Sequence, residues 1–206
     1  MRVRLPSGRR ILISPFFPWE SRRDVLLKVR TAGAFHPSHV TTRLCLELLE
    51  EHLCATRCDT LLDVGCGCGV LALAAASMGV GRAVGVDIDC RAVRLSRENA
   101  LANGLAANSY WVTGSSAAIR GSFPCVVANL PLEALHGLLG DLVRLLADKG
   151  ALVLSGFQDV HWYDLHSKLE RLNLESVRML SGDLTFYGIP PSGSFTWMAV
   201  MARRGR

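Results

Sequence analysis

Short apolar segments alternate with segments of helical periodicity from residue 60 onward, and this alternation constrains the fold more than any other feature of the chain. Strands that alternate with helices form βαβ units, so the sequence predicts a parallel sheet. The strand segments are apolar throughout, so we expect helices on both faces of that sheet. The predicted strands are residues 60–64, 83–86, 109–113, 125–128 and 151–154. The predicted helices are residues 40–53, 70–78, 90–103, 132–146 and 159–172.

The two ends of the chain depart from this alternation. Residues 175–180 and 195–201 predict two strands with no helix between them, which favours a C-terminal antiparallel hairpin. With the five earlier strands, this gives an α/β, Rossmann-like fold with a mostly parallel seven-stranded sheet. Residues 1–30 form an N-terminal extension in which two apolar segments flank Pro6-Ser7-Gly8, as in a hairpin. We therefore divide the chain into this extension and one domain of residues 31–206.

The composition is that of a globular protein. Half of the 206 residues are hydrophobic and a fifth are charged, enough for one domain with a substantial core. The apolar runs are too short to span a bilayer and no signal-type segment opens the chain, so we expect a cytosolic protein without a membrane partner. The net charge of +5 arises from arginines concentrated at both termini. These basic termini are compatible with contact to RNA or a ribosome surface, or they serve solubility alone.

The seven cysteines do not suggest a disulfide framework, because their number is odd and no export signal accompanies them. Cys66 and Cys68 form a C-x-C within a glycine-rich loop, and Cys54 and Cys58 form a C-x-x-x-C. A structural metal site needs four ligands at workable spacings. We therefore expect small buried thiols and no metal.

The strongest sequence signal for a ligand is the glycine-rich run DVGCGCG from Asp63 to Gly69, between the first strand of the sheet and the helix after it. Gly65 and Gly67 have no side chains, so a ligand can lie on the backbone and unusual dihedral angles are permitted. A dinucleotide fingerprint reads G-x-G-x-x-G, but here the third glycine comes one residue early. Asp63 also disfavours a pyrophosphate and favours a ligand with sulfonium and ammonium groups.

Asp87 ends the second strand of the alternating region, 22 residues after Gly65, where a carboxylate can accept hydrogen bonds from both hydroxyls of a ribose. Such charge-assisted bonds contribute roughly 1.5–3 kcal/mol each. This combination favours S-adenosylmethionine (SAM) as the cofactor. The alternatives are a nicotinamide or flavin nucleotide as the cofactor, or a glycine-rich turn that is purely structural and binds no ligand. Ile88 and Ser115 are further candidate contacts, with Ser115 in the loop where adenine would lie. Asp89 is interpreted as the N-cap of the next helix.

Residues 34–43 (AFHPSHVTTR) resemble the loop and helix start of the bacterial ribosomal-protein methyltransferases of the PrmA type. The run at 63–69, then residues 85–89 (GVDID) and 127–130 (VANL), follow in that family's order. The resemblance covers about residues 32–160. It implies a class I methyltransferase fold and the methylation of amino groups of a large-subunit ribosomal protein.

The resemblance also implies roles for individual residues. Contacts to SAM or to the transfer site are implied for Thr42, Gly65, Asp87 and Asn129. Phe35 and His39 are implied to lie in a loop that closes over the cofactor. Independently of the family, Thr41 and Thr42 stand at a predicted helix start, where threonine is a natural N-cap.

Asn129 is the candidate catalytic residue. It ends the fourth strand of the alternating region, next to the expected methyl position, and its side-chain carbonyl could accept a hydrogen bond from an amine or from SAM. The segment 129–132 (NLPL) is a partial relative of the N-P-P-Y motif but lacks the aromatic residue that stacks on a planar acceptor. This favours an aliphatic amine over a nucleobase or glutamine. The alternative is that Asn129 and Pro131 simply form a strand-to-helix turn.

Two departures from the family leave the acceptor open. The family's G-T-G becomes His36-Pro37-Ser38, which stiffens the loop, and only residues 1–33 precede Ala34, too few for the family's separate substrate-gripping domain. The leading hypothesis is a protein amino-group methyltransferase. A small-molecule or RNA methyltransferase and a catalytically idle SAM-binding module are the alternatives.

Overall fold

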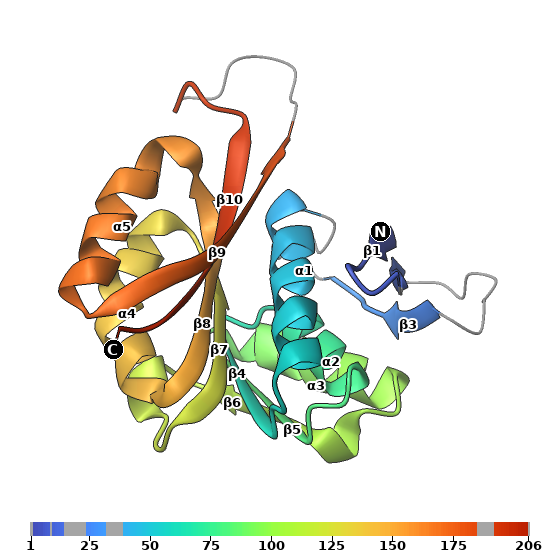
Figure 1. Ribbon diagram of the computed structural model, residues 1–206. Coiled ribbons are helices and arrows are strands. Elements are labelled where there is room, and N and C mark those ends of the chain that lie inside the picture. The colour runs from blue at the N-terminus through green and yellow to red at the C-terminus, as the bar shows by residue number, and fades with distance from the viewer. Residues whose placement is uncertain (1, 9, 15–23, 32–38, 185–191, 206) are drawn as a thin grey trace.

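The computed structural model describes residues 2–8, 10–14, 24–31, 39–184 and 192–205. Its centre is a seven-stranded sheet with the strand order β6-β5-β4-β7-β8-β10-β9 (Figure 1). Every strand runs in the same direction except β10, which is antiparallel to both β8 and β9. The predicted mostly parallel sheet and C-terminal antiparallel hairpin are confirmed. The strands are β4 (Thr60–Val64), β5 (Arg82–Asp87), β6 (Ser109–Thr113), β7 (Phe123–Asn129), β8 (Leu146–Gln158), β9 (Leu174–Asp183) and β10 (Thr196–Arg204).

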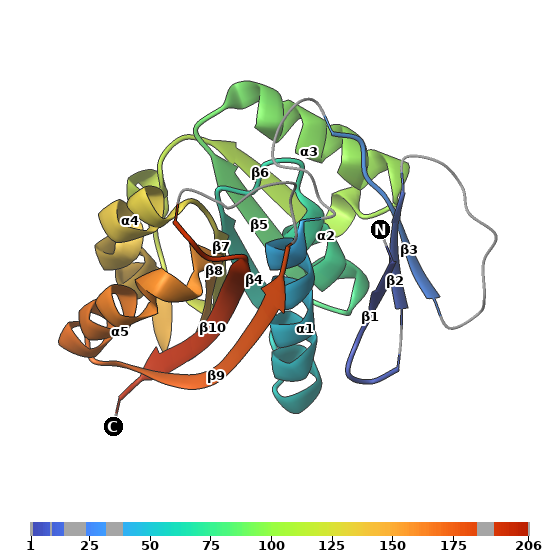
Figure 2. The same ribbon diagram turned by 90° about the horizontal axis from the view of Figure 1, so that it is seen from above.

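Helices cover both faces of this sheet (Figure 2). One face carries α1 (Val40–Ala55), α2 (Val70–Ser77) and α3 (Cys90–Ala102), and the other carries α4 (Leu132–Leu145) and α5 (Trp162–Arg171). Successive residues of a strand point to opposite faces, so Leu61 belongs to the core under the first three helices and Leu62 to the core under the other two. Among the described residues, no helix is both long enough and apolar enough to cross a membrane.

The bounds of the elements differ from the predicted ones mainly at their ends. β8 extends well beyond residues 151–154, because β7 and β10 hydrogen-bond to its two edges. The helix predicted at 159–172 begins as a 3-10 turn, Asp159–His161, before α5. Two further 3-10 turns, Ala106–Asn108 and Ser116–Ala118, flank β6.

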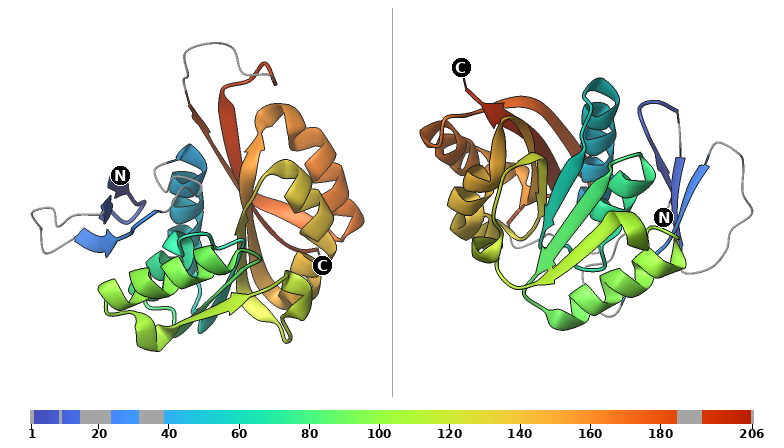
Figure 3. Two further views of the ribbon diagram at one scale, coloured as in Figure 1. Left: turned by 180° about the vertical axis from the view of Figure 1, so that it is seen from behind. Right: turned by 90° about the horizontal axis from the view of Figure 1, so that it is seen from below.

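A second, three-stranded sheet lies beside α1 and α2 (Figure 3). Its strands β1 (Arg2–Arg4) and β2 (Arg10–Ser14) form the predicted hairpin, whereas β3 (Asp24–Lys28), which pairs parallel with β2, was not predicted. Its buried side chains belong to the same core as α1 and α2; they include Val3, Ile11 and Leu27. The division at residue 30 stays a prediction, but this small sheet is packed into the larger fold through a shared apolar core.

Asn99 of α3 and Asn103, the C-cap of that helix, hold the chain where it leaves β3. The backbone N–H of Lys28 donates to Oδ1 of Asn103 at 2.8 Å, and that of Arg30 donates to Oδ1 of Asn99 at 2.9 Å. Asn99 Nδ2 also donates to the carbonyl oxygen of Cys68 at 2.9 Å. One side chain therefore joins the N-terminal segment to the glycine-rich loop.

The C-terminal arginines make contacts within the protein. Arg204 Nη2 donates to the carbonyl oxygens of Val143 at 2.9 Å and Leu146 at 3.1 Å, where α4 meets β8. Arg203 Nη2 lies 3.5 Å from Nδ1 of His52 on α1. These contacts fasten the end of β10 to both helical layers.

Candidate functional site

The predicted site residues lie at the carboxyl edge of the sheet, where β4, β5 and β7 end. β4 pairs with β5 on one side and β7 on the other, so the chain order reverses at β4. In open α/β sheets, ligands bind beyond the carboxyl ends of the strands at such a switch point. The loop after β4, Asp87 at the end of β5 and Asn129 at the end of β7 all belong to this edge.

The three glycines of the loop after β4 all have positive φ angles, 73° at Gly65, 54° at Gly67 and 81° at Gly69. A Cβ on Gly65 would meet Leu130 Cδ2 at 2.2 Å, and one on Gly69 would meet the ring of Trp111 at 2.5 Å. These two glycines therefore allow close packing within the protein. A Cβ on Gly67 would meet nothing within 4 Å, so Gly67 alone of the three faces open space. The expected direct ligand approach thus fits Gly67 better than Gly65.

The Asp87 carboxylate is fixed by two backbone donors. Its Oδ2 accepts from the Gly67 N–H and its Oδ1 from the Asp89 N–H, both at 2.9 Å. The next side chain, Ile88, is 82% exposed, so a large apolar group faces solvent beside the carboxylate. Asp89 caps α3 by accepting from the Arg91 N–H at 2.8 Å, which confirms its interpretation as an N-cap. The strand end therefore presents a carboxylate and an apolar surface side by side.

Asp63 is buried beneath the loop, with only 1% of its surface exposed. Its Oδ2 accepts from the Ala72 N–H at 3.2 Å, at the start of α2. Burial raises the pKa of Asp63 to about 7, opposed by the Ala72 hydrogen bond and assisted by the negative charge of Asp87. A positive charge at this edge would relieve the repulsion between the two carboxylates, so the site favours a cationic ligand.

Thr42 and Asn129, 87 residues apart in the sequence, meet in the structure. Asn129 Nδ2 donates to Thr42 Oγ1 at 3.4 Å, and Thr42 is 1% exposed. Asn129 Oδ1 is buried and has no hydrogen-bond partner among the described residues. An unsatisfied buried acceptor costs about 1–3 kcal/mol. Oδ1 of Asn129 can therefore accept a hydrogen bond from a donor that is not among the described residues.

His39, rather than either threonine, is the N-cap of α1. Its Nδ1 accepts from the Thr41 N–H at 3.3 Å and lies 2.8 Å from Thr41 Oγ1. The expected threonine caps are wrong because the imidazole nitrogen takes this place. The ring packs edge-on against Trp197 of β10, with centroids 4.9 Å apart, and burial lowers the pKa of His39. Phe35 lies outside the described residues.

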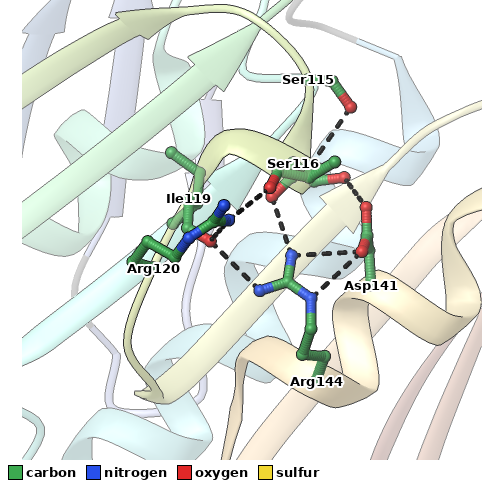
Figure 4. A network of polar contacts seen from close by, with 7 residues as sticks. Ser115, Ser116, Ile119, Arg120, Asp141 and Arg144 are labelled. Carbon is green, nitrogen blue, oxygen red and sulfur yellow. Dashed lines mark hydrogen bonds and ion pairs between the residues drawn. The ribbon is translucent and has the colours of Figure 1, made fainter.

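The loop after β6 is pinned to α4 by a polar network (Figure 4). Ser116 Oγ donates to Asp141 Oδ2 at 2.8 Å, and Arg144 donates to the carbonyl oxygens of Ser116 at 3.0 Å and Ile119 at 3.1 Å. The candidate residue Ser115 is exposed and caps the 3-10 turn by accepting from Ala117 N–H. Asp141 and Arg144 were missed by the sequence analysis; an acidic and a basic residue three apart on the following helix were their only signal.

The loop cysteines are structural. Cys66 and Cys68 are buried, as expected, and burial raises the pKa of both thiols, that of Cys68 to about 11. Within the part of the chain that the structure describes, no three His, Cys, Asp or Glu side chains are grouped to hold a metal ion.

Comparison with known proteins identifies the family. The ribosomal protein L11 methyltransferase (PrmA) family matches residues 5–182, most of the chain. The chain belongs to this family. The L11 methyltransferase of Pelobacter propionicus is 41% identical over 160 residues, which cover 74% of this chain and 51% of that protein. The chain spans about half the length of such relatives.

Solved structures share the fold of this L11 methyltransferase family member. A ribosomal protein L11 methylase from Lactobacillus delbrueckii subsp. bulgaricus has a TM-score of 0.77 at 22% identity and covers 100% of this chain and 99% of its own. Magnesium protoporphyrin IX methyltransferase from Synechocystis, solved with bound SAM, has a TM-score of 0.64 at 20% identity, covering 78% of this chain and 76% of its own. The class I methyltransferase fold is thus confirmed.

Proposed function

We propose that this chain is a SAM-dependent methyltransferase that transfers a methyl group to an amino group of a protein. Membership of the L11 methyltransferase family supports the reaction, and a neighbour of the same fold binds SAM. The observation that carries the proposal is the buried Oδ1 of Asn129, an acceptor without a partner among the described residues, at the same edge as the glycine loop and Asp87. An amine N–H is a donor that satisfies it.

The residues on the β4–β5 side fit this cofactor. Asp87, held by Gly67 and Asp89, would accept from the ribose hydroxyls, and exposed Ile88 would pack against the adenine. Ser115 would line the adenine side, in the loop pinned by Arg144. The buried Asp63 carboxylate complements a positive charge. When bound, SAM supplies a methyl group on a positively charged sulfur.

The residues on the α1–β7 side would prepare the acceptor. A lysine amine has a pKa of about 10.4 in water and must lose a proton before its lone pair can react. Burial favours the neutral amine, and Asn129 Oδ1 accepting one N–H would orient the nitrogen. Thr42 Oγ1, bonded to Asn129 Nδ2, keeps the amide from rotating. His39 and Phe35 would lie in the segment that covers the cofactor.

Contact with a ribosomal surface or RNA through the basic termini is a further part of this proposal. Arg203 and Arg204 already contact His52, Val143 and Leu146, which leaves the N-terminal arginines as the better candidates; Arg4 is exposed. Such contact predicts binding that weakens as the salt concentration rises.

The test combines binding with transfer. Calorimetry should show binding of SAM and of S-adenosylhomocysteine, and tight NADH binding would contradict the assignment. Labelled SAM should then be incubated with the chain, purified ribosomal protein L11 and, separately, a cell extract. Label on protein amino groups supports the proposal. Label confined to RNA or to a metabolite, or no transfer, contradicts it.

A further inference from the structure

A groove of about 430 Å³ lies between α3 and β6, the strand at one edge of the large sheet (Figure 2). Arg97, Ala100 and Leu101 of α3 line one side, and residues 109–111 of β6 line the other. These three residues begin β6, whereas the candidate cofactor residue Ser115 follows the carboxyl end of that strand. The groove is therefore separate from the site described above.

Two side chains that line this groove are buried and have polar atoms without partners. Ser109 is 6% exposed and Trp111 is 8% exposed. Ser109 Oγ and Trp111 Nε1 have no hydrogen-bond partner among the described residues. The two residues are two positions apart on β6, so their side chains lie on the same face of the sheet. Buried polar atoms nearly always have a partner, so this pair indicates that the groove is built to receive a ligand.

The packing of Trp111 shows on which side of its ring the free N–H lies. A Cβ on Gly85 of β5 would meet Cζ3 of Trp111 at 2.5 Å and Cε3 at 2.6 Å, and a Cβ on Gly69 would meet Cη2 at 2.5 Å. This edge of the indole therefore packs against β5 and the glycine loop. Nε1 belongs to the opposite edge of the ring from Cε3, so its N–H faces away from β5, on the side where Trp111 borders the groove.

The groove also carries positive charge. Arg97 Nη2 donates to the carbonyl oxygen of Trp111 at 3.0 Å, which holds the guanidinium against β6. Neither Arg97 nor Arg94, one helical turn earlier, forms an ion pair with a carboxylate of the described residues, and the neighbouring Glu98 is paired with Arg30 at 3.4 Å. Guanidinium and indole N–H groups donate hydrogen bonds and accept none, so the groove complements an anion.

Apolar side chains extend the groove beyond these donors. Leu101 and Tyr110 are exposed large hydrophobic residues, and both line it. An aromatic face and an apolar side chain beside a cation suit a planar ring that carries the negative charge. An extended peptide fits less well, because a strand that paired with this part of β6 would have to displace Arg97 from the Trp111 carbonyl.

We propose that this groove binds a small organic anion with an aromatic ring. The anionic group accepts hydrogen bonds from Arg97 and from Nε1 of Trp111, and the ring lies against Leu101 and Tyr110. The Ser109 hydroxyl, which can donate or accept, bonds to the same ligand. A guanidinium binds carboxylate and phosphate alike, so the anionic group is one of these two. The volume of the groove is within the range of small-molecule sites.

The test is an NMR titration of the ¹⁵N-labelled chain, in which each of the four tryptophans gives its own indole N–H resonance. Indole-3-acetate and phenyl phosphate are the probes, and indole and phenol are their uncharged controls. The Trp111 resonance, assigned by its loss in Trp111→Phe, should shift and saturate with a charged probe and require at least about tenfold more of its uncharged control. The charged probe that binds more tightly identifies the anionic group. The same shift should occur with and without saturating S-adenosylhomocysteine, because the groove is separate from the candidate cofactor site.

Arg97→Met retains all four indole resonances and should weaken the binding of the charged probes by about tenfold, the effect of losing a charge-assisted hydrogen bond. Arg91→Met is the matched control. It removes the same charge from the same helix, but from a guanidinium that is paired with Asp89 at 3.0 Å, and it should leave the affinity unchanged. No shift of the Trp111 resonance, equal affinity for charged and uncharged probes, loss of binding when S-adenosylhomocysteine is added, or equal affinity in Arg97→Met and the wild type would overturn the proposal.

Discussion

Two regions meet at the carboxyl edge of the sheet and satisfy their polar groups differently. On the β4–β5 side, both oxygens of Asp87 accept backbone N–H groups, and Asp63 accepts another. On the α1–β7 side, Asn129 makes one 3.4 Å contact to Thr42, and its Oδ1 has no partner among the described residues. The first region is fixed before any ligand arrives, whereas the second has an acceptor that no described residue satisfies.

This difference suggests that one region determines cofactor affinity and the other determines turnover. Groups held by the backbone lose little freedom when a ligand binds, which favours affinity. A buried acceptor without a partner raises the energy of the free protein, and that cost is recovered when a donor arrives. We therefore expect changes on the β4–β5 side to alter cofactor affinity and changes on the α1–β7 side to alter turnover.

The largest effect is expected for Asp87→Ala. This change removes the acceptor for the ribose hydroxyls and should weaken SAM binding by about 100-fold, since charge-assisted bonds contribute roughly 1.5–3 kcal/mol each. Calorimetry measures this. Asp89→Ala is the matched control, because it removes a helix cap and should lower stability by about 1 kcal/mol with little loss of affinity. Equal SAM affinity in Asp87→Ala and the wild type would show that Asp87 does not bind the ribose.

Asn129→Ala should lower kcat by about 30-fold, the effect of losing a hydrogen bond worth roughly 2 kcal/mol to the reacting amine. The melting temperature and the SAM affinity should change little, because Oδ1 has no partner among the described residues and the lost Nδ2 contact to Thr42 is long, at 3.4 Å. Asn108→Ala, which removes an exposed asparagine bonded to the Gly81 carbonyl, is the control and should leave kcat unchanged. Early unfolding with normal turnover per folded molecule would favour the turn interpretation of Asn129 and Pro131.

The pH dependence of binding should report Asp63. Its pKa of about 7 means that the carboxyl is largely neutral at pH 6 and anionic at pH 8. A cationic ligand prefers the anion, so SAM affinity should rise by up to about tenfold between these values. Asp63→Asn keeps an acceptor for the Ala72 N–H and should flatten the profile. An unchanged profile in Asp63→Asn would assign the titration to another group.

The same carboxyl affects the free energy of unfolding with the opposite trend. Its pKa is higher in the folded protein than the usual value near 3.9, so between about pH 4 and pH 7 the folded state binds the extra proton. The Asp63 contribution should therefore lower stability as the pH rises through this range and level off above pH 7. Urea unfolding of the ligand-free wild type and of Asp63→Asn at several pH values measures this contribution, as the difference between their free energies of unfolding.

The smallest effect is expected at the loop after β6. Arg144→Met removes the donors to the Ser116 and Ile119 carbonyls, so Ser115 becomes less well positioned and the KM for SAM should rise by about threefold, with kcat unchanged. Arg120→Ala is the control, since Arg120 on the same loop (Figure 4) donates through Nη1 to the Ala117 carbonyl at 2.7 Å in an exposed bond and lies 3.5 Å from the Ile119 carbonyl, but bonds to no described residue of α4. A lower kcat with an unchanged KM for SAM would contradict this prediction, because it would show that the loop acts in turnover and not in SAM binding.

Features encoded by short stretches of sequence were predictable. The apolar segments predicted the bounds of β4 to β7 to within two residues at each end. This was possible because a strand covered on both faces must be apolar throughout. The glycine spacing and Asp87 pointed to one edge of the sheet, since the carboxyl ends of parallel strands meet there. The cap at Asp89 depends only on the residues that follow it.

Contacts between distant segments were decided by the tertiary structure. Thr42 meets Asn129 because α1 packs across the sheet, and Trp197 reaches His39 because β10 inserts between β8 and β9. The short segment of β3 pairs only because β2 offers an edge. Local periodicity and turn chemistry fix elements over a few residues, whereas the burial of whole faces selects which of those elements become neighbours.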